Sequence, residues 1–343
     1  MSTTSTAIPE TMRASVLTGV GEIVMEERPV PRPQRDEVLI KVAAVGVCGS
    51  DVHYYREGRI GDFVVDAPLV LGHEVSGRIV AVGDDVDASR TGERVAIEPQ
   101  RPCRVCGQCK AGRYNLCPEM EFYATPPIDG AFCEYVTIQA DFAHPVPDAV
   151  SDESAALLEP LSVGIWASRK ARIVPGSRVL IAGAGPIGVI TAQAARAFGA
   201  AEVIVSDPAA DRRALAERFG ATRTLDPTKE AVRDLAVDAF IDASGATPAV
   251  ISGIEAVRGG GVVVLVGMGA DQIPMPIPVI QARELIITGV FRYTDTWPLA
   301  AHLVASGQVD LDSVVTARFA LEDTEKALNN DKVPGTLKTL VVL

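Results

Sequence analysis

The sequence predicts an α/β protein with two domains, one of them built on a doubly wound parallel sheet. After about residue 160, strands and helices alternate, which is typical of a parallel sheet with helices on both faces. The strands in that part are almost continuously apolar, as expected for a sheet that is buried on both sides. Before residue 160, glycine, proline and short β-branched runs dominate. The length of 343 residues also suits about two domains.

The first part of the chain shows strand signals bounded by turn residues. Three runs rich in β-branched and apolar residues are expected to form short strands, at Val38–Val42, Val75–Val82 and Arg94–Ile97. A further run, Phe132–Val136, alternates in polarity like a strand and would bury Cys133. We therefore expect a strand-rich first domain.

In the second part the elements follow one another at a regular pitch. The expected elements are, in chain order, the strand Arg178–Ala182, the helix Ile187–Phe198, the strand Glu202–Ser206, the helix Asp211–Phe219, and the strands Asp238–Ala243 and Val262–Val266. From about Trp297 the pattern is mixed, and we expect the chain to return to the first domain there. The predicted domains are residues 1–160 together with 297–343, and residues 161–296.

Composition and charge argue against several classes of protein. The formal net charge of −12 disfavours nucleic acid or an anionic membrane surface as the main partner, because both attract a surplus of cations. No uncharged apolar run approaches the roughly 18 residues of a membrane span. The polar first twelve residues lack the apolar core of a secretory signal and are expected to be a loose tail. These observations favour the cytoplasm, where thiols stay reduced, so the six cysteines need a role other than disulfides.

A glycine-rich turn predicts a dinucleotide site in the second domain. Gly183–Gly188 matches the pattern GxGxxG, and it follows an expected strand and opens an expected helix, which is the context that this motif requires. The glycines allow a tight turn and a close approach of a pyrophosphate to the helix N-terminus. Asp207 ends the next strand, where a carboxylate can bind both ribose hydroxyls and repel a 2′-phosphate, which predicts NAD rather than NADP. Arg212 and Arg213 lie nearby, and an arginine in this region can instead accept a 2′-phosphate.

Four cysteines in a short loop predict a structural zinc site. The spacing Cys103-x2-Cys106-x2-Cys109-x7-Cys117 places four thiolates in a segment rich in glycine and charge, which suits a closed tetrahedral zinc site. Such a site has no open position, so the ion would hold together a lobe that lacks a core of its own. An iron–sulfur cluster fits these spacings less well, and four unrelated thiols are the remaining interpretation.

A second group, Cys48 and His73, lies near glycine-rich turns but forms no local motif. A lone cysteine is more often a buried packing residue, and a lone histidine is more often a structural one. Their interest is that a cysteine, one of only four histidines and acidic groups occur beside a dinucleotide-binding domain. One cysteine, one histidine and one carboxylate would form a catalytic zinc site with a fourth, open position. The spacing alone does not show that these residues converge.

Taken together, these motifs resemble the zinc-dependent medium-chain dehydrogenases, and most closely their sorbitol and xylitol, or polyol, dehydrogenase branch. The resemblance covers the chain from about Met12 to the C-terminus. Besides the four-cysteine loop and the glycine turn, the segments that carry it are Gly46–Tyr54, Leu71–Glu74, Ala124–Pro127, Leu158–Gly164 and Gly289–Tyr293. The segments around Glu159 and Arg292 favour a polyol dehydrogenase over a simple alcohol dehydrogenase.

The resemblance implies a GroES-like β-barrel catalytic domain, a Rossmann domain and two zinc ions in each subunit. Cys48, His73 and a carboxylate would bind the catalytic zinc, and both Glu74 and Glu159 are candidates for that carboxylate. Contacts to the polyol are implied for Tyr54, Phe122, Thr125, Glu159, Arg292 and Tyr293. Contacts to NAD are implied for Gly183, Gly185, Ile187, Gly188, Asp207, Arg212, Val266, Gly267, Met268, Val290, Phe291 and Arg292. The family further suggests a homotetramer, assembled by sheet extension between Rossmann domains.

The same resemblance implies oxidation of a secondary alcohol by hydride transfer to NAD. Zinc lowers the pKa of a bound water from roughly 16 to about 7, and a substrate hydroxyl should become more acidic in a similar way. The family pattern implies that the proton passes through Ser50 to His53 and then to solvent, because histidine titrates near neutral pH. Glu159 completes the expected catalytic set.

The same residues also bear on alternative activities. A threonine, butanediol or simple alcohol dehydrogenase would use the same zinc and cofactor chemistry, so these activities stay open. A non-catalytic zinc-binding relative is disfavoured because the ligand set is intact. A zinc peptidase is excluded because the His-Glu-x-x-His pattern is absent, since the fourth position after His73 is Gly77.

Overall fold

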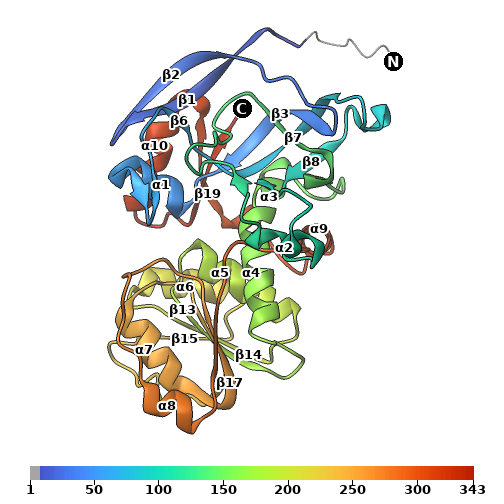
Figure 1. Cartoon of the computed structure of the whole chain (residues 1–343). Helices are drawn as coiled ribbons and strands as arrows, with labels where there is room; N and C mark the ends of the chain where they lie inside the picture. The colour runs from blue at the N-terminus through green and yellow to red at the C-terminus, as the bar shows by residue number, and fades with distance from the viewer. Residues whose placement is uncertain (1–7) are drawn as a thin grey trace. The chain divides into compact units, whose positions relative to one another are not determined.

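The computed structural model describes residues 8–343 (Figure 1). The first seven residues of the expected terminal tail lie outside the described residues. The last two, Thr11 and Met12, do not belong to a loose tail, because they begin the strand β1. The chain forms two compact units, of which the first ends at Glu159 and resumes at Val315, and the second comprises Pro160–Val314. The return to the first unit therefore comes at Val315 instead of near Trp297.

The first unit is built mainly from antiparallel strands. Its largest sheet has seven strands in the order β12-β8-β7-β3-β20-β19, and β11 also pairs with β3. These strands are β3 (Glu37–Gly46), β7 (Glu74–Val82), β8 (Arg94–Ile97), β11 (Tyr135–Gln139), β12 (Ala143–Pro145), β19 (Val315–Ala320) and β20 (Lys338–Val342). A second sheet consists of β1 (Thr11–Gly19), β2 (Glu22–Pro29) and β6 (Leu69–Val70). Apolar side chains of both sheets pack in one buried core.

Short strand pairs and helices complete the first unit. The two-stranded pairs are β4 (Arg59–Ile60) with β5 (Phe63–Val64), and β9 (Gln100–Arg101) with β10 (Glu121–Phe122). The helices are α1 (Gly49–Glu57), α2 (Gly107–Lys110), α3 (Asp152–Ala156) and α10 (Thr324–Leu328). The chain passes from the first unit into the second inside α4 (Leu158–Lys170).

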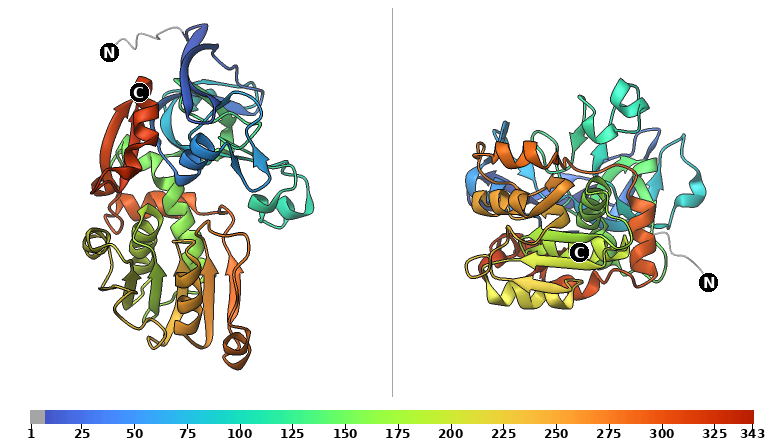
Figure 2. Two further views of the ribbon diagram at one scale, coloured as in Figure 1. Left: turned by 90° about the vertical axis from the view of Figure 1, so that its left-hand side faces the viewer. Right: turned by 90° about the horizontal axis from the view of Figure 1, so that it is seen from below.

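The second unit contains a six-stranded sheet that is parallel throughout. Its order is β15-β14-β13-β16-β17-β18, with helices on both faces (Figures 1 and 2). The strands are β13 (Arg178–Ala182), β14 (Glu202–Ser206), β15 (Arg223–Leu225), β16 (Val237–Asp242), β17 (Val257–Leu265) and β18 (Ile286–Gly289). Besides α4, the helices are α5 (Pro186–Ala197), α6 (Ala210–Arg218), α7 (Thr247–Ala256), α8 (Ile277–Ala282) and α9 (Trp297–Ala305). This arrangement confirms the predicted α/β class with a doubly wound sheet.

Three expected strands differ clearly from the structure in extent. β3 continues past the expected end at Val42 to Gly46. β11 begins at Tyr135 rather than Phe132, because Phe132 and Cys133 pair with the neighbouring β1 instead, through Ser15 and Ala14. Cys133 is buried, as expected. β17 begins at Val257, earlier than expected, because Val257 already pairs with Val237 of β16. The register then shifts, and pairing resumes between Val262 and Ala239, beyond three glycines that carry no apolar signal.

The stretch after Trp297 packs in the second unit. Trp297 is fully buried, and its ring lies edge-on against Tyr293 with the ring centroids 6.1 Å apart. Further along, the Gln193 side chain of α5 accepts a hydrogen bond from the Asp310 amide at 2.8 Å and donates one to its carbonyl at 3.1 Å. These contacts explain why the boundary lies at Val315. Within the described residues, every helix is too short or too polar to cross a lipid bilayer.

Candidate active site and metal centres

Cys48, His73 and Glu74 converge in the first unit. One ligand atom from each residue lies within 4.8 Å of the ligand atoms of the other two. His73 and Glu74 are buried, and Cys48 is partly exposed. A thiolate, an imidazole and a carboxylate at this separation form a donor set that suits zinc with one position left open.

The turn before helix α1 positions the sulfur. Cys48 is the N-cap residue of α1, in extended backbone conformation. Asp51, in the first turn of the helix, is fully buried and accepts hydrogen bonds from the amides of Cys48 and Gly72, both at 2.9 Å. Its carboxylate also lies 3.6 Å from Nδ1 of His73. Asp51 therefore joins the two segments that supply the sulfur and the imidazole, and such supporting contacts orient ligands around a metal.

The electrostatics of this cluster follow from its burial. Burial alone would lower the pKa of His73, but the negative charges of Asp51 and Cys48 raise it well above its ordinary value. A proton is therefore held strongly at the imidazole when no other cation is present. A metal ion would replace that proton, because a histidine ligand must be neutral.

Glu74 has one carboxylate oxygen paired and one without a partner. Oε1 accepts a hydrogen bond from Nζ of Lys338 at 2.6 Å, and the same ammonium donates to the carbonyl of Val47 at 2.7 Å. Among the described residues, Oε2 is buried and finds no hydrogen-bond donor. A Cβ at Gly46 would lie 1.8 Å from Oε2, so this glycine makes room for the carboxylate. A buried anionic oxygen without a donor is costly unless a cation binds it, which fits a metal at this position.

Two further predicted site residues, Glu159 and Phe122, lie near this cluster. Glu159 is buried, and its charge contributes to the raised pKa of Lys338, but it lies outside the three-residue group of ligand atoms. The geometry thus favours Glu74 over Glu159 as the third donor. The ring of Phe122 packs against the imidazole of His73 with centroids 5.5 Å apart, which covers one side of this residue with apolar surface.

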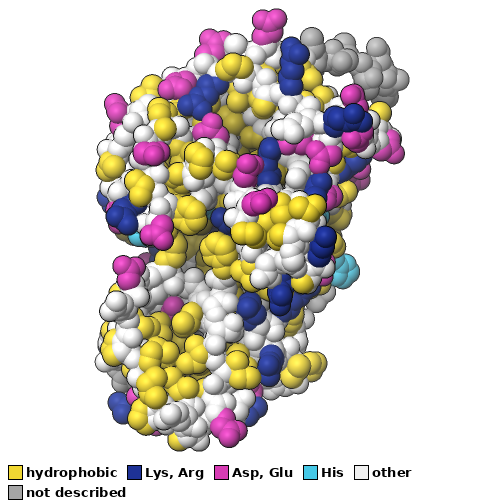
Figure 3. Space-filling view, in the orientation of Figure 1, with side chains coloured by type: hydrophobic (Ala, Val, Ile, Leu, Met, Phe, Trp, Pro, Cys, Tyr) yellow, Lys and Arg dark blue, Asp and Glu magenta, His cyan; other side chains and the backbone are white. Residues whose placement is uncertain are grey.

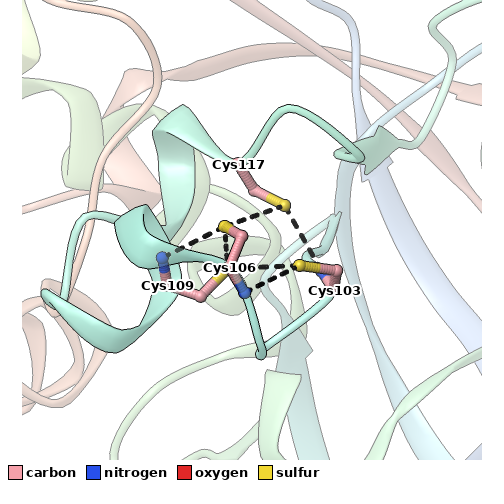
Figure 4. Close-up of side chains that lie close together, drawn as sticks. All are labelled: Cys103, Cys106, Cys109 and Cys117. Carbon is pink, nitrogen blue, oxygen red and sulfur yellow. Dashed lines mark hydrogen bonds between the residues drawn. The ribbon is translucent and has the colours of Figure 1, made fainter.

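The four cysteines of the loop point toward one another (Figure 4). The sulfurs of Cys106 and Cys109 are 3.5 Å apart, those of Cys106 and Cys117 are 3.9 Å apart, and those of Cys103 and Cys109 are 4.0 Å apart. A tetrahedral ion with Zn–S bonds of about 2.3 Å separates its sulfurs by roughly 3.8 Å. The four sulfurs are therefore spaced as the ligands of one such ion.

Backbone amides and burial shift the pKa of a thiol in this cluster in opposite directions. The amide of Cys109 donates to Sγ of Cys106 at 3.4 Å, and this contact lowers the pKa of Cys106 to about 7. Burial raises the pKa of Cys109 to about 12 and also raises that of Cys117. Burial therefore opposes ionisation of Cys109 and Cys117, and a bound cation would favour the thiolate form of both.

The glycine turn leaves open space at the N-terminus of α5. Gly183 has a positive φ of 94°, and a Cβ at Gly188 would lie 1.9 Å from the Gly183 carbonyl oxygen, so both positions require glycine. By contrast, a Cβ at Gly185, the N-cap residue of α5, would meet no atom within 4 Å. The backbone there faces unfilled space that a pyrophosphate could occupy.

Asp207 follows β14 and is fixed by two backbone amides. Its Oδ2 accepts a hydrogen bond from Ala184 in the glycine turn at 2.9 Å, and its Oδ1 accepts one from Ala209 at 2.8 Å. Arg212, one turn into α6, has a buried Nη1 that makes no hydrogen bond to the described residues. The carboxylate and this guanidinium nitrogen both retain hydrogen-bonding capacity for a ligand.

The remaining predicted site residues divide between the two units. In the first unit, Ser50, His53 and Tyr54 lie on α1, with His53 exposed and Tyr54 buried, and Thr125 is half-buried in the loop after β10. In the second unit, Met268 and Phe291 are exposed, and Tyr293 is fully buried. Arg292 stacks on Phe291, with 4.8 Å between the guanidinium carbon and the ring centre. The half-buried residues are Ile187, Val266, Gly267 and Val290. Their contacts to cofactor or substrate stay predictions.

Two residues that support the cluster were not predicted from the sequence. Asp51 lies three residues after Cys48, a spacing typical of a capping box at a helix start, so a local signal was present. Lys338 lies 264 residues after Glu74, and no local pattern links the two. Only the pairing of β20 with β3 brings this lysine to the site.

Two family models match the chain. The model described as "Alcohol dehydrogenase GroES-like domain" matches residues 34–148, and the model described as "Zinc-binding dehydrogenase" matches residues 186–306. The first match lies wholly in the unit that contains Cys48, His73 and the four-cysteine loop. The second begins within the glycine turn and lies wholly in the unit with the parallel sheet.

Individual proteins resemble the chain over nearly its whole length. A sorbitol dehydrogenase of Bacillus subtilis is 44% identical and covers 94% of both chains. A Neosartorya fischeri protein named "Probable D-xylulose reductase A" is 42% identical and covers 98% of both. Among solved structures, a zinc-binding dehydrogenase of Sinorhizobium meliloti bound to NADP superposes with a TM-score of 0.90 at 32% identity, covering 98% of this chain and 100% of that one.

Proposed function

Because the chain belongs to the zinc-binding dehydrogenase family, we propose that it is an NAD-dependent polyol dehydrogenase, which oxidises a sorbitol- or xylitol-like substrate to the ketose. The observation that carries this proposal is the convergence of Cys48, His73 and Glu74 in a chain so similar to a sorbitol dehydrogenase. Each chain would bind two zinc ions, one at this cluster and one at the four cysteines. A cytoplasmic location is also proposed, since all six cysteines are free thiols in the structure.

The first zinc site would activate the alcohol. When bound, zinc supplies a Lewis acid that lowers the pKa of the substrate hydroxyl. Cys48, His73 and Glu74 would hold the ion, with the unpaired Oε2 of Glu74 as the carboxylate donor. Asp51 fixes the segments that carry the sulfur and the imidazole, and Lys338 fixes the carboxylate from the opposite side.

Helix α1 offers a route for the proton that leaves the substrate. Ser50 and His53 are three residues apart on this helix, which places them on one face. Ser50 would take the proton by a hydrogen bond and pass it to His53. The His53 side chain is 47% exposed and its Nδ1 lies 3.5 Å from Oε1 of Glu57, so it can exchange a proton with solvent.

Polar and aromatic side chains would select a polyol. The residues that the family resemblance implies for these contacts are Tyr54, Phe122, Thr125, Glu159, Arg292 and Tyr293. A site that presents hydrogen-bond donors to several hydroxyls disfavours a simple alcohol, because the donors would then lack partners. Arg292 supplies five such donors on one planar group.

The proposed cofactor preference depends on Asp207. With its oxygens held by the amides of Ala184 and Ala209, the carboxylate is fixed in place to accept hydrogen bonds from the ribose hydroxyls. Its charge would repel a 2′-phosphate. Arg212 would contribute its unpaired Nη1 to the adenosine end of NAD, while Gly183, Gly185 and Gly188 accommodate the pyrophosphate.

A substrate panel combined with metal analysis tests the proposal. Sorbitol, xylitol, arabinitol and ribitol are compared with ethanol, butanediol and threonine at fixed NAD, by NADH absorbance, and zinc is measured on the same sample. We expect two zinc ions per chain and a kcat/KM for the best polyol at least about tenfold above that for ethanol. A preference for butanediol or threonine would replace the polyol assignment with one of those activities.

Replacing the metal-binding sulfur separates the two proposed sites. Cys48→Ser should lower turnover by at least about a thousandfold and lower the zinc content from two ions to one. NADH binding, followed by fluorescence, should change little, because the glycine turn and Asp207 both lie in the second unit. Cys133→Ala, which removes a buried thiol that belongs to neither cluster, serves as the control and should retain both zinc ions.

A further inference from the structure

Two adjacent arginines of helix α6 have different surroundings. Arg212 has a buried Nη1 without a hydrogen-bond acceptor among the described residues. Nη1 of Arg213 instead donates to the carbonyls of Asp207 at 2.6 Å and Pro208 at 2.9 Å. Arg213 thus points its charge back at the turn that carries the proposed ribose-binding carboxylate.

A second carboxylate lies beside Arg213 and forms an ion pair with it. Oδ2 of Asp226 lies 3.6 Å from Nη1 of Arg213, with side-chain exposures of 10% and 17%. Asp226 directly follows β15, the strand beside β14, and the amide of Asp207 donates to the carbonyl of Leu225 at 3.2 Å. The two aspartates therefore end neighbouring strands of the parallel sheet, with Arg213 beside both.

The turn after Asp226 keeps its carboxylate in place. Oδ1 accepts hydrogen bonds from the hydroxyl of Thr228 at 2.6 Å and from its amide at 3.0 Å. Lys229 lies 3.3 Å from Oδ2, but its side chain is 77% exposed and is screened by solvent. The Thr228 hydroxyl is the largest cause of a pKa of about 2 for Asp226, so this residue stays ionised in any working buffer.

We propose that Asp226 is a second determinant of cofactor specificity, which acts by holding Arg213 away from the place where a 2′-phosphate would bind. The inference rests on the proposed preference for NAD. Asp207 and Asp226 offset the charges of the two arginines, and the third cation of this region, Lys229, is exposed and screened by solvent, so the loop offers little surplus positive charge. A 2′-phosphate adds about two negative charges and needs such a surplus. Removing the Asp226 charge leaves Arg213 bonded to two neutral carbonyls, so its positive charge is no longer compensated in this loop.

A neighbouring carboxylate provides a matched control. Oε1 of Glu230 accepts a hydrogen bond from the amide of Asp226 at 3.3 Å, and its Oε2 lies 3.4 Å from Arg223. Among the described residues, these contacts of Glu230 go to Asp226 and Arg223 and not to Arg213. Glu230→Gln therefore makes the same change in charge on the same turn without touching the Arg213 contact.

The test compares dissociation constants of NADH and NADPH for the full-length zinc-loaded protein, measured by fluorescence without a polyol. Asp226→Asn keeps an acceptor for Thr228, and we expect it to shift the ratio of the two constants about tenfold toward NADPH. Glu230→Gln should change the ratio by less than about twofold. Asp226→Ser is the second variant if the first does not fold, and it is judged by the same ratio.

The partner residue provides the second half of the test. In an Arg213→Gln background, Asp226→Asn should shift the ratio no more than Glu230→Gln does, because the uncompensated guanidinium is absent. A purely structural role would weaken both dinucleotides equally and leave the ratio unchanged, and that result would overturn the proposal. An undiminished shift in the Arg213→Gln background would also overturn it. The wild-type ratio separately tests the NAD preference, so the two proposals can fail independently.

Discussion

At the scale of single residues, the proposed metal site depends on charges that compensate one another without solvent. The side chains of Glu74 and Lys338 are 1% and 3% exposed, and their ion pair has a length of 2.6 Å. Burial alone would lower the pKa of Lys338, but the charges of Glu74 and Cys48 raise it, so the lysine stays protonated. A buried ion pair of this kind adds little to the stability of the fold compared with well-packed apolar residues. Removing one partner, however, leaves the other charge buried and unpaired.

Lys338→Met should therefore destabilise the protein and disturb the cluster. We expect a loss of about 3 kcal/mol in the free energy of unfolding, measured with denaturant. We also expect a changed visible spectrum after cobalt replaces zinc, because the Glu74 carboxylate loses the contact that orients it. The double variant Lys338→Met/Glu74→Gln should recover part of the stability without recovering the metal. A Lys338→Met protein as stable as the wild type would show that the pair does not have this role.

The residues of this cluster could be predicted from the sequence only in part. Cys48 and His73 were predicted through a family resemblance, since nothing in their spacing requires them to meet. Glu74 and Glu159 could not be separated, because the choice depends on which carboxylate the fold brings to the sulfur and the imidazole. Lys338 could not be predicted at all, because its partner lies 264 residues earlier in the chain.

At the scale of elements, charged side chains join neighbouring strands at one end of the parallel sheet. Arg178 of β13 pairs with Glu202 of β14 at 2.6 Å, and its amide donates to Asp238 of β16 at 2.7 Å. The same aspartate accepts a hydrogen bond from Arg258 of β17 at 2.6 Å. This ionic ladder crosses four adjacent strands, so it links the central strands of the sheet.

The ladder predicts how stability changes with pH. Burial raises the pKa of Asp238, but the Arg178 amide and Arg258 outweigh it and lower the pKa below the ordinary 3.8. The ionised carboxylate thus stabilises the fold above about pH 4, and this contribution is lost as the pH falls through the lowered pKa. Asp238→Asn should cost about 1 kcal/mol at pH 7, since the side chain is partly exposed, and much less near pH 2.

Unfolding curves at pH 7, 4 and 2 measure this difference. Asp234→Asn, a change at an exposed aspartate outside the ladder, is the control and should leave the curves unchanged at every pH. A difference between wild type and Asp238→Asn that grows toward low pH would contradict the assigned sign.

The strength of the local signal decided which elements could be predicted. β13 and β14 have the predicted bounds, because each is a continuous apolar run in a sheet buried on both faces. β11 is displaced from its expected start because pairing with β1, which is distant in sequence, takes up Phe132 and Cys133. Long-range pairing of this kind leaves no periodic trace in the segment itself.

At the scale of the whole molecule, the sheet of the second unit ends on one side at an edge strand. β18 is the last strand in the order, and Ile286 within it is 39% exposed. In the same unit, Ile277 is 52% exposed, Met268 is 55% exposed and Phe291 is 50% exposed. On the face drawn in Figure 3, apolar side chains gather where α7 and α8 lie in Figure 1. An edge strand flanked by apolar surface is a template for pairing with another chain.

The edge strand predicts assembly through β18 of two copies, consistent with the tetramer that the family resemblance suggests. Ile286→Lys should block this pairing, because a charge on an edge strand opposes the addition of another strand. Light scattering should then give about half the mass of the wild-type assembly. Val105→Lys replaces an apolar side chain that is 68% exposed on the four-cysteine loop, and it should leave the mass unchanged. If Ile286→Lys assembles like the wild type, copies associate through a surface other than β18, and the open edge of the sheet must be protected in some other way.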